Sequence, residues 1–129
     1  SMSKRFGTEA GTALKRPVIE FYVKDDALND PLITEDLVEV LGYLPGSVSI
    51  AQLKTQALAV NECLRAFYAA YGIRCADFKL EFGLNASGQL VVGDELSPDN
   101  FRLRDQATGQ ILDKDVFRQG IADLVETYT

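Results

Sequence analysis

The chain has 129 residues, of which 47% are hydrophobic and 25% are charged, and its net charge is −6. This is the size and balance of one globular domain, and the acidity argues against non-specific binding to nucleic acid or to an anionic membrane. Because the sequence contains no histidine, it excludes a Ser-His-Asp triad, a Cys-His pair and a histidine-liganded metal within this chain.

The two cysteines, Cys63 and Cys75, form no CxxC motif. We expect both to be small buried apolar residues in a reducing compartment, and the protein to be cytoplasmic. We see no signal peptide and no apolar run long enough to span a bilayer. Acid–base work would fall to carboxylates or lysines, and a bound metal would take oxygen ligands, which favours magnesium.

The N-terminal half predicts one strand and one short helix. Residues 1–16 have weak periodicity, and we expect an irregular segment there. Residues 17–24, PVIEFYVK, alternate apolar and polar side chains and predict a strand with one buried face. After a polar loop, Thr34 is expected to cap a short helix over EDLVEVL, which Gly42 ends.

A long helix is the strongest prediction in the chain. Ser49 and Gln52 have the spacing of a capping box at its start, and Gly72 is expected to end it. Apolar residues then recur at intervals of three and four, and we expect their stripe to face the core: Leu53, Ala57, Val60, Leu64, Phe67 and Tyr71.

The C-terminal half predicts strands and a last helix. Residues 76–83, ADFKLEFG, alternate without a fault, and residues 89–96, QLVVGDEL, follow after an Asn/Gly/Ser turn, which is typical of a β-hairpin. SPDN then turns, FRLRD forms a short strand, and Asp113 caps a helix over the following residues. The predicted class is α+β, an antiparallel sheet with helices packed on one side.

The open face of the predicted strand over residues 76–83 carries Asp77, Lys79 and Glu81, and its hairpin partner carries Asp94 near its far end. We expect Glu81 and Asp94 near opposite ends of the open part of the ladder, and a modest change of register or twist would bring their carboxylates toward one site. Two carboxylates from adjacent strands, with a lysine beside them, would then suit Mg²⁺ and a phosphate. Alternating charge on a strand is more commonly just a solvated face.

Several segments, taken in order, resemble the C-terminal half of the phosphoribosylaminoimidazole-succinocarboxamide synthase (SAICAR synthetase) family: SMSKRFGTEAGTAL, FYVKDDALNDPLITE, ADFKLEFG, GDELSPDNFRLRD and LDKDVFRQ. The resemblance implies the substrate and metal lobe of an ATP-grasp-related fold. It also implies a ligase of purine biosynthesis that needs Mg²⁺, with ATP as co-substrate. That ligase joins L-aspartate to carboxyaminoimidazole ribonucleotide through an acyl phosphate, giving the succinocarboxamide, ADP and phosphate.

The resemblance also implies roles for single residues. Glu81 and Asp94 match the metal-binding acids, and Arg102 and Ser1 match groups that hold the 5′-phosphate of the ribonucleotide. Lys79 and Asp99 match catalytic contacts near the reacting carboxylate. The groups near the aspartate substrate are Lys24, Asp30 and Arg118, while Asp77 belongs to the motif without a clear role and is grouped with the substrate-binding residues.

The sequence departs from the family pattern at several points, two of which bear on function. It lacks the Gly-Lys-x-Lys strand of the N-terminal lobe that covers ATP, and Arg104 stands where the family often has tryptophan. We therefore expect residues 1–129 to form a single domain without complete catalysis of its own, which needs the lobe in cis or in trans. A fragment, half of a split enzyme and a homo-oligomer all stay open. The alternatives are a non-catalytic ribonucleotide-binding module or sensor, and a structural remnant without a ligand.

Overall fold

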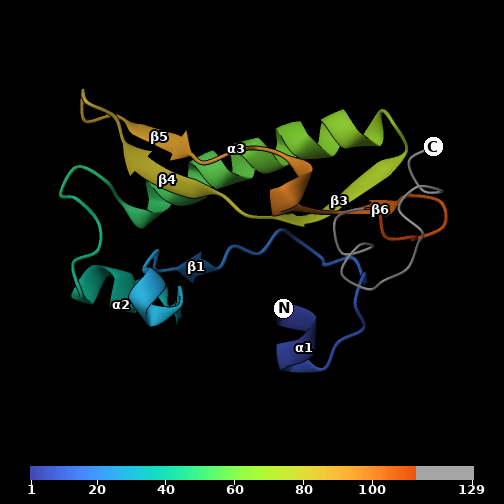
Figure 1. Cartoon of the computed structure of the whole chain (residues 1–129), viewed down its shortest axis with the longest axis horizontal. Coiled ribbons are helices and arrows are strands. Elements are labelled where there is room, and N and C mark those ends of the chain that lie inside the picture. Colours follow the sequence, from blue (N-terminus) through green and yellow to red (C-terminus); the bar gives the residue numbers. More distant parts are fainter. Residues whose placement is uncertain (113–129) are drawn as a thin grey trace. The chain divides into compact units, whose positions relative to one another are not determined.

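The computed structural model describes residues 1–112, which fall into two compact units. The first unit contains Ser1–Leu14 and the described chain from Asn61 onward, and the second unit is Lys15–Val60. The long helix α3 (Ile50–Ala69) contributes its N-terminal half to the second unit and its C-terminal half to the first (Figure 1).

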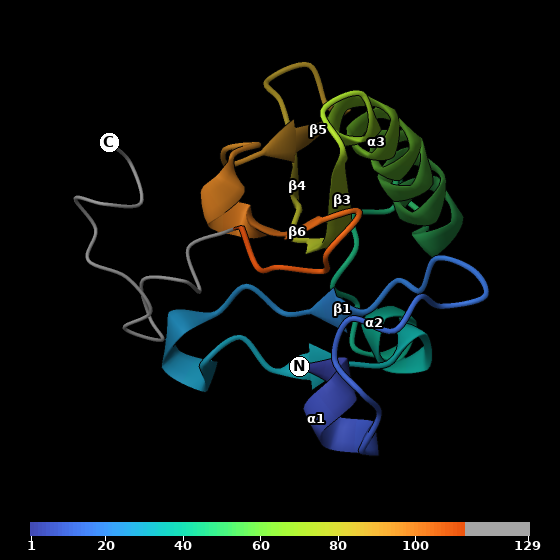
Figure 2. The ribbon, with the colours of Figure 1, turned by 90° about the vertical axis from the view of Figure 1, so that its right-hand side faces the viewer.

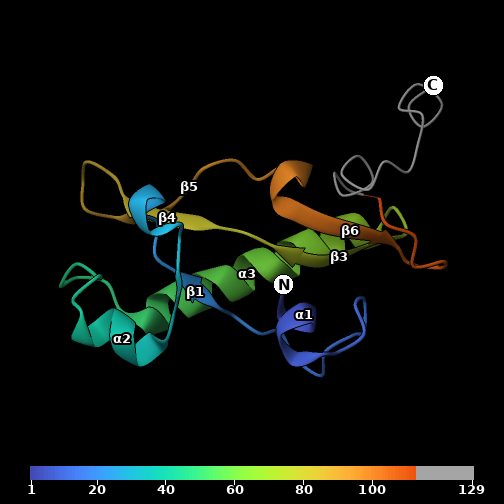
Figure 3. The same ribbon diagram turned by 60° about the horizontal axis from the view of Figure 1, so that its bottom comes forward.

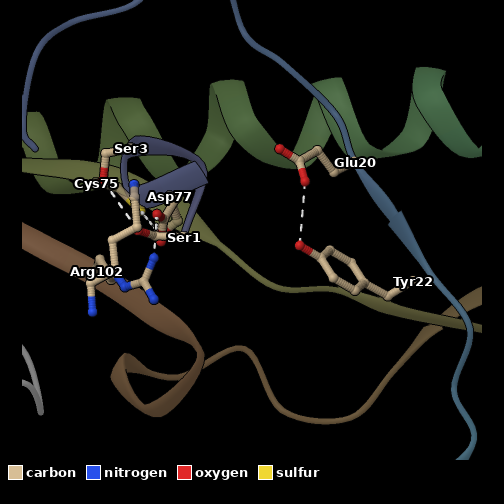
Figure 4. Close-up of polar contacts among 8 residues, drawn as sticks. Ser1, Ser3, Glu20, Tyr22, Cys75, Asp77 and Arg102 are labelled. Carbon is tan, nitrogen blue, oxygen red and sulfur yellow. Dashed lines mark hydrogen bonds and ion pairs between the residues drawn. The ribbon is translucent and has the colours of Figure 1, made fainter. Parts of the chain in front are cut away.

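The second unit begins with a very short strand pair. β1 (Phe21–Tyr22) pairs antiparallel with β2 (Leu32–Ile33), and the 3₁₀ turn η1 (Asp26–Leu28) lies between them. The prediction of a strand over residues 17–24 was therefore too long, and its apolar side is only half-buried. The strand is short because its partner β2, which was not predicted, offers only two residues for pairing. Beside this strand, the Tyr22 hydroxyl donates to Glu20 (3.3 Å; Figure 4).

The helix caps of the second unit are confirmed. Thr34 Oγ1 accepts a hydrogen bond from the Leu37 amide (3.2 Å) at the start of α2 (Glu35–Val40). At the start of α3, the Ser49 amide donates to Gln52 Oε1 (2.8 Å) and the Gln52 amide donates to Ser49 Oγ (3.2 Å). This reciprocal pair is a capping box. The buried core residues here are Val38, Ile50 and Leu53.

The first unit opens with a helix, not with the irregular segment that we expected. α1 (Met2–Phe6) is capped by Ser1, whose Oγ accepts from the Lys4 amide (3.4 Å), and it ends at Gly7 in the left-handed conformation. The sequence carries both signals for this helix, because Ser1 can cap its start and Gly7 can end it. Only five residues lie between them, which is too few to show a helical period.

The remaining strands form two separate antiparallel pairs. β3 (Ile73–Phe78) pairs with β6 (Phe101–Asp105), and β4 (Glu81–Leu84) pairs with β5 (Leu90–Gly93). The 3₁₀ turn η2 (Pro98–Asn100) precedes β6. The antiparallel α+β class is confirmed, but the single predicted sheet is replaced by three two-stranded pairs.

The predicted unbroken strand over residues 76–83 was therefore wrong. It divides at Lys79 and Leu80, so that its first half pairs with β6 and its second half with β5. The β3–β6 register also shifts between Cys75 and Asp77, which leaves Ala76 as the extra residue of a bulge. A bulge bends its strand and re-aims the side chains beyond it.

The core of the first unit lies between the C-terminal half of α3 and the β3–β6 pair, which run alongside each other in Figures 2 and 3. Phe101 and Leu103 are buried, with 3% and 5% of their surface exposed. The Tyr68 and Phe78 rings each meet the Phe101 ring edge to face, at 6.1 Å and 6.3 Å between centroids. Such aromatic contacts add to the burial of apolar surface.

Three residues that we expected in the core lie at the surface. Phe67 and Tyr71 are exposed, and Tyr68 makes the inward contact in their place. The helix ends at Ala69, so Tyr71 no longer follows the helical period. Cys63 in α3 is also exposed, whereas Cys75 is half-buried, and both thiols are free.

The last helix predicted after Asp113 lies outside the described residues. Within residues 1–112, no helix combines the length and apolar character needed to cross a membrane.

Candidate functional site

The β4–β5 hairpin places the two predicted metal-binding acids at the same open end. Glu81 is the Cα partner of Gly93 in the last rung, and Asp94 comes directly after it. The turn at the other end is held by Asn85 Oδ1, which accepts from the amides of Ser87 (3.0 Å) and Gln89 (2.9 Å). The turn was predicted, but Glu81 and Asp94 were expected near opposite ends of the open part of the ladder, and the observed register places them at the same end.

Asp94 has an unusual backbone conformation, with φ of 59°. This is the left-handed region, which non-glycine residues occupy at a cost and in which Asp and Asn are the best tolerated. The residue is exposed. The left-handed turn directs the chain out of β5 and breaks the strand pattern at the point where a second carboxylate was predicted.

Lys79 and Glu81 form an ion pair, with Nζ 3.0 Å from Oε1. The two side chains differ in burial, since 58% of the Lys79 side chain is exposed but only 19% of the Glu81 side chain. The pair spans the break between β3 and β4, where consecutive side chains need not alternate. An ammonium group and a carboxylate thus share one end of the hairpin.

Asn100 joins this break to the turn before β6, a role that the sequence analysis missed. Its carbonyl accepts from the Lys79 amide (2.9 Å), and its Nδ2 donates to the Glu95 carbonyl (2.8 Å). Ser97 caps the same turn by accepting from the Asp99 amide (3.3 Å). The turn that carries Asp99 is therefore fixed against the backbone of Lys79. The only local signal was an asparagine at the end of a Ser-Pro-Asp turn.

Asp77 and Arg102 are Cα partners across the β3–β6 pair. Arg102 Nη1 donates to Asp77 Oδ2 at 2.9 Å (Figure 4), and about half of each side chain is exposed. The bulge at Ala76 sets this register. The aspartate whose role the sequence left open thus holds the arginine that was assigned to a phosphate.

The other predicted site residues are less closely tied to this group. Ser1 caps α1, where its hydroxyl also lies 3.1 Å from that of Ser3. Lys24 and Asp30 belong to the second unit, where Asp30 Oδ1 accepts from the Asp25 amide (2.8 Å) and so closes its own loop. Arg118 lies outside the described residues.

The cysteine nearest to this group is not a nucleophile at neutral pH. Burial, with a smaller contribution from the Asp77 carboxylate, raises the pKa of the Cys75 thiol to about 11. Its Sγ donates to the Asp77 carbonyl (3.6 Å). Because only the thiolate attacks, the chemistry available here is that of lysine, arginine and carboxylates.

The donor set suits magnesium better than a transition metal. Among residues 1–112, no cluster of three or more His, Cys, Asp or Glu side chains could hold a metal ion. Glu81 and Asp94 offer two carboxylates at one hairpin end. Mg²⁺ is commonly bound by one or two carboxylates, with waters and substrate phosphates completing its shell. The residues present therefore fit a magnesium ion shared with a phosphorylated ligand.

Comparison with known proteins gives consistent results. A family model described as SAICAR synthetase matches residues 1–129. A phosphoribosylaminoimidazole-succinocarboxamide synthase of Lactococcus lactis subsp. lactis (strain IL1403) is 50% identical over 129 residues, which are 100% of this chain and 54% of that protein. The protein of the same description from Shouchella clausii (strain KSM-K16) is 49% identical over 128 residues, with coverage of 99% and 53%. The chain thus spans about half the length of these curated relatives.

Solved structures agree in fold. A SAICAR synthetase (Type-2) in complex with ADP superposes with a TM-score of 0.83 at 42% identity, over 98% of this chain and 54% of that one. The phosphoribosylaminoimidazole-succinocarboxamide synthase of Ehrlichia chaffeensis gives a TM-score of 0.86 at 38% identity, with the same coverage of 98% and 54%.

Proposed function

The chain belongs to the SAICAR synthetase family, whose members are ligases of purine biosynthesis, and on that premise we propose that it supplies the ribonucleotide- and metal-binding half of the active site. The proposed reaction joins L-aspartate to carboxyaminoimidazole ribonucleotide while ATP becomes ADP and phosphate. The observation that carries the proposal is the strand junction at Lys79, which brings together the Lys79–Glu81 ion pair and the turn that holds Asp99.

The proposed chemistry has two steps. A carboxylate oxygen of the ribonucleotide attacks the γ-phosphorus of ATP, and the bond to the bridging oxygen of ADP breaks, which leaves an acyl phosphate. The amino nitrogen of aspartate then attacks the acyl carbon. Phosphate leaves with the electrons of the C–O bond, the nitrogen loses a proton, and an amide remains. Both steps gather negative charge on oxygens, and fixed cations stabilise such charge.

Lys79 and Asp99 are the proposed catalytic residues. The exposed ammonium of Lys79 would stabilise the oxygens of the reacting carboxylate, and its ion pair with Glu81 fixes where that ammonium lies. An ionised carboxylate only accepts hydrogen bonds, so Asp99 would orient an N–H group of the substrate. Asn100 acts as a positioning residue, because it fixes the Asp99 turn to the Lys79 backbone.

Glu81 and Asp94 would hold Mg²⁺, which when bound offsets negative charge on the phosphate oxygens. Arg102 and Ser1 would hold the 5′-phosphate. A guanidinium presents a planar fork of N–H donors that suits a phosphate, and Asp77 holds the Arg102 guanidinium through Nη1. Asp77 thus serves as a positioning residue for Arg102.

The rest of the proposal depends on the resemblance to the family. Lys24, Asp30 and Arg118 would contact the aspartate substrate, and an ATP-covering lobe of the ATP-grasp-related type would come from chain outside these residues, in cis or in trans. The two free cysteines suit a reducing cytoplasm.

A calorimetric titration tests the proposal. Carboxyaminoimidazole ribonucleotide is added with and without Mg²⁺ to the chain, to Asp94→Asn and to the control Glu62→Gln. Glu62 is an exposed α3 carboxylate that pairs with the neighbouring Arg65. We expect Mg²⁺-dependent binding that Asp94→Asn loses and Glu62→Gln keeps. Equal affinity in all three would refute the metal assignment. Loss of a charged ligand contact should weaken binding by about tenfold or more.

Catalysis needs a second measurement. The chain is mixed with a separately produced N-terminal lobe of a full-length relative, ATP, Mg²⁺, L-aspartate and the ribonucleotide, and the succinocarboxamide is measured by chromatography. We expect product from the mixture and at least about a hundredfold less from Lys79→Met, because removing one stabilising donor typically costs that much in rate. A folded mixture that binds the ribonucleotide but forms no product would leave only a binding module.

A further inference from the structure

Two arginines face each other directly across the β3–β6 pair. Arg74 is the Cα partner of Arg104, two residues along β6 from Arg102. Opposed residues in an antiparallel pair point to the same face, and like charges in that position are destabilising. In β6 the buried residues Phe101 and Leu103 alternate with Arg102 and Arg104, so Arg104 lies on the open face of the pair. Arg74, which is opposite Arg104, lies on that same face.

Both guanidinium groups lie against the same backbone turn. Arg74 Nη2 donates to the Gly11 carbonyl (2.7 Å), and a Cβ at Gly11 would lie 3.1 Å from the Arg104 Cζ. Arg104 Nη1 donates to the Gly109 carbonyl (3.1 Å). Since Gly11 binds Arg74 and a Cβ at Gly11 would meet the Arg104 guanidinium, both guanidinium groups lie beside one residue, and both arginines are half-buried.

The carbonyl groups of Gly11 and Gly109 carry no net negative charge that could neutralise the two guanidinium groups. Among residues 1–112, neither Arg74 nor Arg104 forms an ion pair, whereas Arg102 pairs with Asp77 and Arg65 pairs with Glu62. The pair stands out in a chain whose net charge is −6. Each guanidinium has five N–H donors, and the carbonyl bonds use one from each.

We propose that Arg74 and Arg104 form a binding site for an oxyanion of the phosphate class, separate from the Arg102 site. Two planar guanidinium forks match the tetrahedral oxygens of a phosphate. Its negative charge would offset the repulsion between the two arginines. The Gly11 turn completes the site by holding Arg74 through its carbonyl and by leaving room for Arg104 where any side chain would intrude.

Calorimetry at constant ionic strength tests this site, with inorganic phosphate and ribose 5-phosphate titrated in parallel. The variants are Arg74→Gln, Arg104→Gln and Arg102→Gln, and the control is Arg65→Gln on the exposed side of α3. We expect saturable binding that weakens about tenfold or more in Arg74→Gln and in Arg104→Gln. Arg65→Gln should bind as the parent does. Arg102→Gln, which alters the proposed 5′-phosphate contact, should keep the binding that depends on Arg74 and Arg104. Binding of both ligands assigns the phosphate group itself, and binding of ribose 5-phosphate alone assigns a phosphate monoester.

Several results of this titration would overturn the Arg74–Arg104 site. Absence of saturable binding overturns the site, as does equal weakening in all four variants, which would indicate only a general charge effect. Loss in Arg102→Gln alone would overturn this site and support the proposed 5′-phosphate contact. Because Arg74→Gln removes a contact to Gly11, each variant is checked by circular dichroism. If it does not fold, Arg74→Lys keeps the charge without the planar fork and should weaken binding several-fold. Unchanged binding in a folded Arg74→Lys together with unchanged binding in Arg104→Gln would refute the proposal.

Discussion

Replacing Asp94 by glycine should stabilise the protein and abolish the proposed Mg²⁺-dependent binding. Asp94 has φ of 59° and is exposed. Among residues 1–112 its side chain forms no hydrogen bond or ion pair, so the substitution removes no such contact within the described structure. A left-handed aspartate costs about 1 kcal/mol, whereas a glycine there costs little.

The expected size of the effect follows from two opposing contributions. Relief of the left-handed backbone conformation raises the free energy of unfolding by about 1 kcal/mol. The greater freedom of glycine in the unfolded chain lowers it by about 0.5 kcal/mol. The free energy of unfolding should therefore rise by about 0.5 kcal/mol, which corresponds to an increase of about 2 °C in Tm. Asp94→Asn tolerates the same conformation and should stay within about 0.3 kcal/mol of the parent.

Urea denaturation of the parent, Asp94→Gly and Asp94→Asn measures the effect, with Glu62→Gly as the matched control. Glu62 is an exposed acid in the regular part of α3, so glycine there should cost about 1 kcal/mol. If the free energy of unfolding rises in Asp94→Gly and falls in Glu62→Gly, the result would support a strained backbone at Asp94 that is kept because it places a carboxylate there. A loss of about 1 kcal/mol in Asp94→Gly would show that Asp94 has a structural contact, and unchanged Mg²⁺-dependent binding would refute its role as a ligand.

Four further predictions test the fold around the site. Gly11→Ala should lower the free energy of unfolding by about 1–2 kcal/mol, because φ is +88° and a Cβ would crowd the Arg104 side chain; Gly46→Ala, in open space, should cost nothing, and equal urea midpoints would contradict this. The Cys75 thiol should react slowly with Ellman's reagent at pH 8 while the exposed cysteine reacts quickly; a single fast phase for both thiols would be inconsistent with its raised pKa. Since that pKa is raised from 9.0 to about 11, the unfolded thiol ionises first, so stability should fall as pH rises through this window, and Cys75→Ala should lose that slope. Phe101→Ala should cost about 3–5 kcal/mol, against under about 1 kcal/mol for the exposed Phe67→Ala, and similar costs would refute the assigned core.

Features governed by neighbours in the chain were predicted well. The Thr34 cap, the capping box of α3 and the turn between β4 and β5 each depend on side chains bonding to amides within four residues. Such interactions form wherever the local sequence allows them. The hairpin follows from its turn, but the common position of Glu81 and Asp94 at one end became clear only from the observed register.

The alternation of apolar and polar residues did not predict the strands correctly where two distant strands pair with one segment. The residues ADFKLEFG alternate without a fault, yet β6 takes the first half and β5 the second, with a bulge at Ala76. Alternation records which side chains are apolar, but it does not record which partner supplies the hydrogen bonds. In the same way, the aromatic rings at the end of α3 could not be sorted until Phe101 was in place, because only Tyr68 meets it.

By itself, the sequence determined the helix caps, the hairpin, the α+β class, and a resemblance strong enough to propose roles for single residues. Only the tertiary structure decided that Asp77 holds Arg102, that Asn100 fixes the Asp99 turn beside Lys79, and that Arg74 faces Arg104. The physical reason is the distance along the chain. Each of these contacts joins residues some twenty or more positions apart, and their pairing depends on strand register and a bulge that packing selects over the whole unit.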